Sequence, residues 1–589
     1  GSAIKNKLSY LIGARYKNNK YILGNMETKG VYQPNFTDVQ GILSYNISPR
    51  LEVSAFGYYS SNNYLMIPET RQTDFGNIQE AHRITIYFDG KEASNYNTGL
   101  GAFTLNFSPN EDLNLKLIAS TYSAIEAENY DIQGQYWIGL LETNPGSEQS
   151  GNVISNQGVG TYIEHARNDF YSQVFNIDHK GAYKKDFYTL KWGARYQHQH
   201  FDDFINEWEM IDSAGFSLPH PADSIGNPNP PHHPFEIRHL SKGHNILNID
   251  NIDGFVHNEW SFNSKNDDIV TLSLGLRANY WGYNKEVNIS PRAGVAFKPS
   301  WNRDMLFRLS GGVYVQPPFY RELRKFDGSL VKPEDASTQK SYQLVFTHEY
   351  NFMAWDRPFV LTSEIYYKYL KDIIPYEVDN IRIKYFADQK ATGYATGMDI
   401  RINGEFVKGI ESWASMSFMK SEENIKYYLS PNGSILSQSD VINGAEYVCD
   451  TLIKGIPRPS DQKVNFSVFF QDYIPYIPSF KVNLKLVFGT GMPFGAPYNE
   501  RYKHIFRMSP YRRVDIGFSK QLISETSSFK KGNPLSHVRN CWLSLEIFNL
   551  LGINNVSSYM WVTDIYNIQY AVPNYLTPRQ INLKLVAEF

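Results

Sequence analysis

Apolar and polar side chains alternate along many stretches of this chain, most clearly along the last one. From residue 581 to the C-terminus one face carries Ile581, Leu583, Leu585, Ala587 and Phe589, and the other carries Asn582, Lys584, Val586 and Glu588. A period of two is typical of a β-strand with one apolar and one polar face. This segment therefore predicts a strand that ends the chain on an aromatic residue.

The same period returns at intervals of a few tens of residues. Residues 113–120, 463–470 and 480–488 alternate in this way, and lysines such as Lys116 and Lys485 lie within their polar faces. A lysine in the middle of a strand is costly against lipid but is well solvated in a water-filled lumen. Repeated along 589 residues, the pattern predicts an all-β protein, a transmembrane antiparallel β-barrel that is apolar outside and polar within.

The connections between these stretches come in two sizes. We expect tight turns around residues 48–50, 108–110 and 301–303, and long loops over residues 61–92, 124–168, 202–246 and 422–459. Short and long connections in alternation give the barrel two unlike ends, with short periplasmic turns and long extracellular loops. Counted in this way, the chain holds about twenty strands, from residues 7–15 to Phe589.

Composition agrees with a barrel and argues against several other classes. Mean hydropathy is −0.43, and no apolar run reaches the length of about 18 residues that a transmembrane helix needs. A barrel strand needs only about ten residues, half of them polar. The alternative is a soluble propeller or sandwich, whose strands would be shorter and more evenly spaced.

Charge, cysteine content and aromatic content exclude further classes of protein. A net charge of −3 offers no field for nucleic acid, and two cysteines are too few for a disulfide framework or a zinc site. Aromatic residues make up 15% of the chain, and tyrosine suits the lipid boundary because its ring is apolar and its hydroxyl reaches water. The aromatic pairs 58–59, 280–281 and 366–367 are expected to belong to such a girdle; ligand stacking is the alternative.

Several segments in the second half of the chain resemble sequence motifs of a known protein family. In order, these are residues 290–297 (SPRAGVAF), 316–319 (QPPF), 332–334 (KPE), 391–399 (ATGYATGMD), 511–515 (YRRVD) and 548–551 (FNLL). Their order and spacing resemble those of the TonB-dependent outer-membrane receptors, particularly the large group found in Bacteroidota. The resemblance implies a barrel of 22 strands, a plug folded inside it, and an N-terminal segment that binds TonB.

The start of the chain also resembles this family. Residues 5–15 are similar to an early barrel strand that normally follows the plug. We therefore expect residues 1–589 to form the barrel alone, with the plug domain and the TonB-binding segment upstream and about 20 of the expected 22 strands in this chain.

The resemblance implies a function as well. It implies TonB-dependent active import of a scarce solute across the outer membrane of a Gram-negative bacterium, the solute being a siderophore, vitamin, glycan, peptide or metal complex. The implied partners are outer-membrane lipid, TonB–ExbB–ExbD through the N-terminal region, and a surface lipoprotein or other envelope subunits. The alternative is a plugless, receptor-like barrel that serves as a structural scaffold subunit in an outer-membrane complex.

No catalytic arrangement and no cofactor are expected. The chain lacks a nucleophile elbow, a phosphate-binding loop, a zinc-protease helix and a nucleotide-binding glycine motif. We therefore predict that the protein is not an enzyme.

Histidines provide the one candidate binding cluster, although no metal site is established by their spacing. Eight of the 14 histidines lie between residues 198 and 257, and His220, His232, His233 and His239 are predicted to share one proline-containing extracellular loop. Imidazoles gathered on one loop suit a transition metal or a haem-like ligand. The composition favours the alternative, a solvated loop stiffened by proline.

Arg512, Arg513 and Asp515 form the last candidate. Strand alternation puts Arg513 and Asp515 on one face and Arg512 on the other. We expect an ion pair facing the lumen here, in preference to an anion-binding site.

Overall fold

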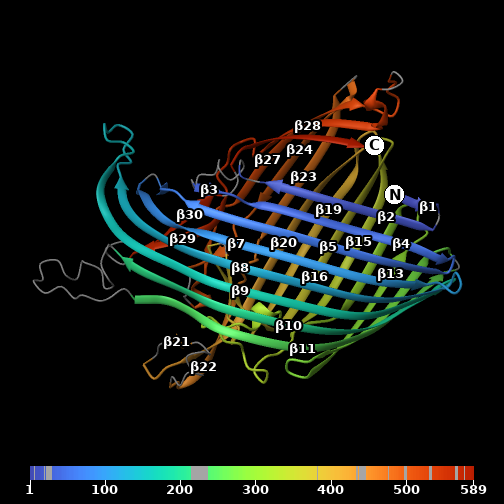
Figure 1. Cartoon of the computed structure of the whole chain (residues 1–589), viewed down its shortest axis with the longest axis horizontal. Helices are drawn as coiled ribbons and strands as arrows, with labels where there is room; N and C mark the ends of the chain where they lie inside the picture. Colours follow the sequence, from blue (N-terminus) through green and yellow to red (C-terminus); the bar gives the residue numbers. More distant parts are fainter. Residues whose placement is uncertain are drawn as a thin grey trace, which may run out of the picture.

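A single curled β-sheet dominates the computed structural model (Figure 1). The structure describes all residues except 6, 19, 21–29, 78, 214–235, 265, 381, 433–434, 437–445, 475–476, 497–499, 530–532, 564–567, 576–577 and 589. In the described part of the chain, no helix is both long enough and apolar enough to cross a bilayer. The short 3-10 helices are η2 (Tyr320–Leu323), η3 (Arg501–Lys503) and η4 (Pro534–His537).

The sheet has 25 strands. Five of them are short additions: β1 (Ser2–Ile4), β3 (Gly30–Tyr32), β6 (Arg71–Gly76), β21 (Ile435–Leu436) and β22 (Cys449–Pro457). The remaining twenty follow one another around the sheet, each antiparallel to the next: β2 (Leu8–Asn18), β4 (Asn35–Ser48), β5 (Leu51–Pro68), β7 (Ala81–Phe107), β8 (Leu113–Leu141), β9 (Val153–Lys185), β10 (Tyr188–Ser213), β11 (Glu236–Asn263), β12 (Ile269–Trp281), β13 (Glu286–Lys298), β14 (Asp304–Gln316), β15 (Gln339–Ala354), β16 (Arg357–Ile373), β19 (Ala391–Val407), β20 (Ile410–Leu429), β23 (Val464–Ile474), β24 (Ile477–Gly489), β27 (Tyr511–Ile523), β28 (Asn540–Phe548) and β31 (Gln580–Glu588).

Three small hairpins lie outside this sheet. They are β17 (Tyr376–Asp379) with β18 (Arg382–Tyr385), β25 (Pro493–Phe494) with β26 (Phe506–Arg507), and β29 (Val556–Thr563) with β30 (Gln569–Tyr575). All three belong to connections at the same end of the sheet, called here the loop end. The opposite end, where the connections are mostly tight, is called the turn end.

The strand pattern read from the sequence is confirmed. The twenty consecutive strands match the predicted number, and both predicted terminal strands are present as β2 and β31. Tight turns join β4 to β5 and β7 to β8, and a turn at residues 299–303 joins β13 to β14, as expected. In the described residues no hydrogen-bonded pairing joins β31 to β1 or β2, the strands at the other edge of the sheet.

The predicted long loops are partly wrong. Most of residues 61–92 and 124–168 belong to strands, because β5 and β7 to β11 continue past the length that crosses a bilayer and β6 adds a short strand beside β7. β9 alone has 33 residues, whereas a tilted strand crosses with about 9–11. The alternation is hidden there because both faces of the extended strands are largely polar, so the pattern resembles that of a loop.

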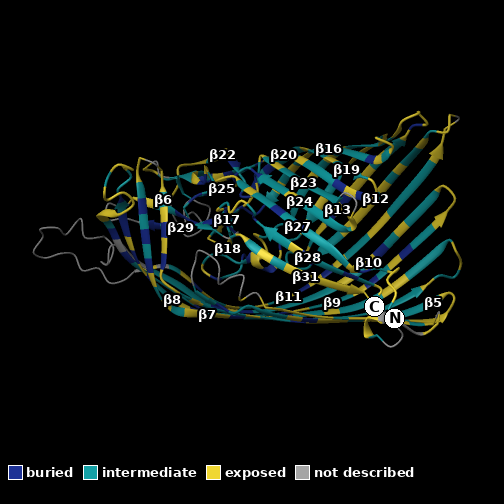
Figure 2. Ribbon diagram, turned by 90° about the horizontal axis from the view of Figure 1, so that it is seen from above, coloured by how far each residue is buried: buried dark blue, intermediate teal, exposed yellow. Residues whose placement is uncertain are grey.

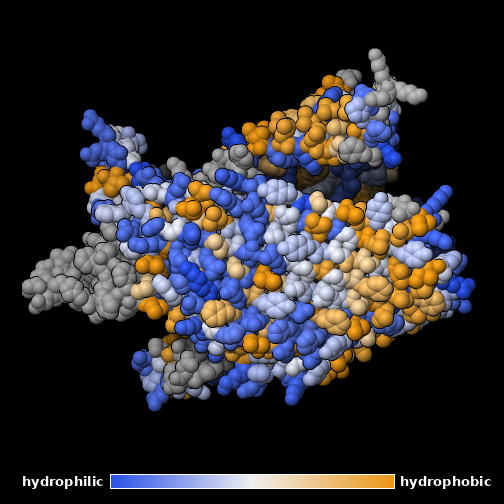
Figure 3. Space-filling model, in the orientation of Figure 1, coloured by the Kyte–Doolittle hydropathy of each residue, from blue (hydrophilic) through white to orange (hydrophobic). Residues whose placement is uncertain are grey.

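Apolar side chains cover much of the outer face. Along β31, Ile581, Leu583 and Leu585 are 74%, 69% and 64% exposed, as the alternation of the last strand predicts. Figure 3 shows apolar residues gathered toward the turn end of the visible face and polar residues covering the extended strands near the loop end. This distribution is typical of a sheet whose half near the turn end lies in lipid and whose half near the loop end lies in water.

Candidate functional site

Three connections fold inward at the loop end instead of extending away from the sheet. They are residues 317–338 between β14 and β15, the β17–β18 hairpin between β16 and β19, and the β29–β30 hairpin between β28 and β31. Figure 2 shows β17 and β18 between the two sides of the curled sheet. Together with the inner wall of β7 to β11, these segments enclose the candidate site.

Residues 317–338, called the 317–338 segment, reach the inner wall several strands away from their own. The Tyr320 hydroxyl donates to Asp203 of β10 over 2.8 Å, and Arg324 lies 3.2 Å from the same carboxylate. Arg321 pairs with Glu126 of β8 at 2.7 Å. Because Asp203 is 2% exposed, these contacts fix the segment tightly against the wall.

The same segment continues along β11 to β13. The Asn245 amide donates to the Gly328 carbonyl over 2.8 Å, and the Tyr283 hydroxyl donates to the Val331 carbonyl. Thr338 donates through its hydroxyl to Glu286 over 2.9 Å. The segment is therefore held along its whole length and behaves as part of the wall.

The β17–β18 hairpin is attached to the wall through Arg382. Its guanidinium donates to Glu207 of β10 over 2.9 Å and to the Tyr130 hydroxyl of β8 over 2.6 Å, and it lies 4.7 Å from the centre of the Tyr130 ring. Burial acts to lower the pKa of Arg382, but Tyr130 and Glu207 raise it overall. The arginine remains a cation that neutralises the wall locally.

The β29–β30 hairpin packs against the wall through apolar contacts. Val562 and Val572 are buried in one cluster with Ile84, Ile86 and Ile138 of β7 and β8. A cluster of this kind excludes water from the contact, so burial of these side chains stabilises the hairpin in its inward position.

Polar contacts link the two hairpins. Asn380, between β17 and β18, is 2.9 Å from both the Ser558 hydroxyl and the Asn574 amide, and Arg71 of β6 donates to the Pro573 carbonyl over 2.7 Å. The loop end is thus bridged from several sides of the sheet.

A buried ion pair joins two further connections. Glu423 of β20 and Arg501 of η3 are 0% and 1% exposed on their side chains and lie 3.0 Å apart. Arg501 also donates to the Pro457 carbonyl over 2.8 Å, and Arg458 lies 3.6 Å from Glu423. This contact ties η3 to the end of β22.

The inner wall facing these segments is acidic. Strand register places seven carboxylates on one face of β7 to β10: Glu92, Glu126, Glu128, Glu164, Asp203, Glu207 and Glu209. Glu164 and Glu209 are direct cross-strand partners, an arrangement of like charges that costs stability. The arginines of the inward segments, Arg321, Arg324 and Arg382, offset part of this charge.

Two titratable groups of the 317–338 segment are shifted by their surroundings. Burial, reinforced by the Asp203 carboxylate, raises the pKa of Tyr320. Burial also raises the pKa of Glu322, although a hydrogen bond from the Phe319 backbone and one from Gln339 oppose the shift. Both groups therefore hold their protons more tightly than they would in water.

The predicted histidine cluster is only partly within the described residues. His220, His232 and His233 lie outside them, so their role stays a prediction. His239 was placed in the long loop, but it lies on β11, opposite Glu209 of β10, because the extended strand continues past it. Among the described residues no group of histidine, cysteine and carboxylate side chains is arranged to hold a metal ion.

Two other sequence predictions have clear outcomes. Arg513 and Asp515 form the expected ion pair, with the Arg513 guanidinium 2.6 Å from the carboxylate.

The girdle prediction is wrong for Trp281, which is 1% exposed and packs against Leu323 of the inward segment. Neighbouring residues of a strand point to opposite faces, so only one member of each aromatic pair can meet lipid.

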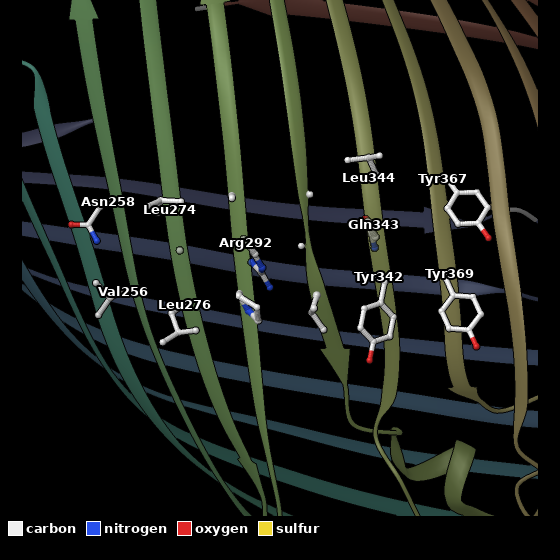
Figure 4. Close-up of a pocket in the computed structure, with 16 residues that line it drawn as sticks. Val256, Asn258, Leu274, Leu276, Arg292, Tyr342, Gln343, Leu344, Tyr367 and Tyr369 are labelled. Atoms are coloured by element: carbon white, nitrogen blue, oxygen red, sulfur yellow. The ribbon is translucent and has the colours of Figure 1, made fainter.

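The outer wall carries a shallow, mostly apolar depression over β11 to β16 (Figure 4). Its centre is recessed because Ala293 has only a methyl group and Gly311 has no side chain, whereas the larger side chains of Leu276, Leu344 and Tyr367 surround it. These residues share the lipid-facing side of the sheet, so the depression belongs to the membrane contact and not to the candidate site.

An antiparallel sheet with an apolar outer face and inward-folded loops defines a protein of the outer-membrane β-barrel class. Residues 30–550 match the family described as "TonB dependent receptor-like, beta-barrel", and the chain belongs to this family. Members of the family are transporters of the outer membrane and not enzymes. No curated protein sequence matches the chain.

Solved structures show the same fold at low identity. The outer membrane transporter YddB from Escherichia coli is 12% identical, with 98% of this chain and 80% of that chain covered and a TM-score of 0.51. FpvA of P. aeruginosa bound to pyoverdines is 11% identical, with coverage of 99% and 68% and a TM-score of 0.60. The RagAB peptide transporter is 12% identical, with coverage of 98% and 74% and a TM-score of 0.50.

Proposed function

We propose that this barrel imports a scarce solute across the outer membrane of a Gram-negative bacterium of the Bacteroidota. In this proposal residues 1–589 are one multi-pass barrel domain, a plug domain fills its lumen, and TonB–ExbB–ExbD drives the plug aside. A surface lipoprotein or another envelope subunit is a further proposed partner. The loop end faces outward and receives the solute.

One observation carries the proposal. Arg382 anchors the β17–β18 hairpin to Glu207 on the inner wall, so a connecting loop is folded into the lumen where a solute must pass. Loops held by a rigid scaffold are the usual place for ligand recognition. A purely structural barrel has no need of an internal chamber bounded by ion-paired loops, which is why import is favoured over a scaffold role.

The family resemblance supports the class of function without fixing the solute. Similar structures include FpvA with bound pyoverdines and a peptide transporter. Their identities of 11% and 12% are too low for the solute to be transferred to this chain, because one fold hosts many functions.

A deletion strain tests the proposal. Uptake of labelled ferric siderophores, cobalamin, oligosaccharides, peptides and metal complexes is compared between the parent, the deletion strain and the strain complemented with the wild-type gene. We expect one solute class to be lost on deletion and restored by complementation, and its uptake to stop when a protonophore collapses the proton gradient. Unchanged uptake of every solute, with other envelope proteins co-purifying with the barrel, would instead establish the scaffold role.

A further inference from the structure

A cavity of about 540 Å³ lies between the inner wall and the start of the 317–338 segment. Its floor is formed by β8 to β12, with most of the residues from β10 to β12, and its roof by Pro317, Pro318 and Phe319. The volume falls within the range of about 300–1,000 Å³ that is usual for small-molecule sites. The chemistry of its lining indicates what it binds.

Every charged residue that lines the cavity is already paired. Arg277 lies 2.8 Å from Asp253, and Arg321 lies 2.7 Å from Glu126. Arg195 is paired with Asp178, which is buried, at 2.6 Å. An anionic or cationic ligand would have to compete with these pairs, so the lining favours a ligand without charge.

Amide side chains supply the uncharged hydrogen-bonding groups of the floor. Gln197, Gln199, Asn251 and Asn279 all line the cavity, and each carries donors and an acceptor. Gln197 donates to Asn176 over 2.8 Å and Gln199 donates to Gln197 over 2.9 Å, so both side chains are held in place. The bonds from Asn251 to Gln197 and Gln199 are longer, at 3.3 and 3.4 Å, and bonds of this length are the ones that a ligand can most easily replace. The Asn279 amide nitrogen donates to Asp253 over 2.9 Å, which holds this side chain in place beside the other amides.

The roof supplies an aromatic surface. Phe319 lines the cavity and is 52% exposed. The ring of the next residue, Tyr320, stacks on Phe201 with centroids 5.0 Å apart. An aromatic face carries partial negative charge and attracts the positively polarised C–H groups of a ligand. Amides on one side and an accessible ring on the other suit a molecule that has hydroxyl groups on its rim and C–H groups on its faces.

A peptide fits this floor less well. At Gln197, Asn251 and Asn279 the strands are hydrogen-bonded to neighbours on both sides, so no strand edge is open to pair with a peptide backbone. The charged termini of a short peptide would also find no unpaired partner in the lining.

We propose that this cavity binds a neutral oligosaccharide. The proposal rests on the import function proposed above and names its solute class. The amides of β10 to β12 bind the sugar hydroxyl groups, and Phe319 covers the face of one sugar ring.

Binding to the purified full chain in detergent tests the proposal. The probes are an array of neutral and acidic oligosaccharides, hexa-alanine and ferric desferrioxamine. We expect binding only to neutral oligosaccharides, weakened at least tenfold in Gln199→Ala and in Phe319→Ala. Asn483→Ala, which removes an amide of β24 outside the cavity lining, should bind like the wild type.

The outcomes separate this inference from the proposed function. The inference would be overturned if the protein preferred the peptide, the ferric chelate or acidic sugars, or if it bound none of the probes. It would also be overturned if neither cavity substitution weakened the binding of neutral sugars. Loss of uptake of a different solute class in the deletion strain would overturn it too, while leaving the import function intact. If the deletion strain takes up every solute as well as the parent does, the import function is refuted, whatever the binding array shows. Circular dichroism and heat-dependent gel mobility confirm that each variant remains folded.

Discussion

The Arg382 guanidinium lies 2.9 Å from the Glu207 carboxylate, although the two residues are 175 positions apart in the chain. Arg382 belongs to a hairpin that leaves the sheet after β16, whereas Glu207 is on β10. The pair therefore connects two distant parts of the sheet through the lumen. It is the contact whose loss should most directly release the hairpin.

Arg382→Ala is expected to free the β17–β18 hairpin. The substitution leaves Glu207 and Tyr130 without their shared donor, which costs about 1–3 kcal/mol. We expect this loss to lower the free energy needed to open the hairpin locally. Hydrogen exchange of residues 376–385 should become faster, while exchange in the spanning strands stays the same. Lys298→Ala, which breaks an exposed pair with Asp304 at the turn end, serves as the control; equal effects of the two substitutions would contradict the anchoring role.

The buried pair of Glu423 and Arg501 should respond differently to single and double substitution. Arg501→Ala leaves a carboxylate buried without its partner and should destabilise the region around η3 by about 3–5 kcal/mol. Glu423→Leu combined with Arg501→Met replaces both charges with apolar groups and should recover most of that loss. Hydrogen exchange of residues 457–507 measures both effects, and a double variant as unstable as the single one would show that the pair is needed for more than charge balance.

Two glycines of β7 offer a matched test of backbone strain. Gly90 has a φ of +100°, and a Cβ there would lie 1.9 Å from the Asp131 carbonyl oxygen, whereas a Cβ at Gly99 would meet nothing within 4 Å. Gly90→Ala should therefore destabilise the protein by about 1–3 kcal/mol, and Gly99→Ala should be neutral or slightly stabilising. Urea unfolding in lipid vesicles compares them, and equal midpoints would argue against the strained geometry.

Adjacent residues of β15 test which face meets lipid. Leu344 is 56% exposed on the outer side, next to Gln343, which faces the lumen. Leu344→Lys should cost about 2–4 kcal/mol because it places a charge in hydrocarbon, whereas Gln343→Lys should be tolerated. Assembly efficiency in vesicles distinguishes them; a reversed order would invert the assignment of the two faces.

The two cysteines test the orientation of the barrel. Cys449 is exposed near the loop end and Cys541 is buried in β28. A membrane-impermeant maleimide should label intact cells through Cys449 alone, and Cys449→Ser should abolish the label. Labelling that requires permeabilised cells would place the loop end in the periplasm.

The spanning strands could be predicted from sequence because lipid on one side and water on the other impose a period of two. That constraint fixes segments such as residues 581–588 without any knowledge of their neighbours. It is absent from residues 124–168, where both faces of the strands meet polar surroundings, so the sequence pattern there predicts a loop although β8 and β9 extend through most of the range.

The candidate site was largely beyond prediction. Arg382, Glu207 and Tyr130 lie far apart in the sequence, and no local pattern indicates that they meet. The ion pair of Arg513 and Asp515 was predictable because its members are two positions apart on one strand. The histidine cluster was predicted from composition alone, and composition does not indicate strand register. His239 therefore lies on β11, which composition could not predict.

The length of β9 also has a consequence for where the solute is met. Thirty-three residues extend roughly 110 Å along the strand, whereas the hydrocarbon core is only about 30 Å thick. Even with a strand tilt of about 45°, this part of the sheet extends well beyond the hydrocarbon core on the side of the loop end. In the proposed orientation, with the loop end outward, a solute would then meet the inner wall well before it reached the level of the hydrocarbon core.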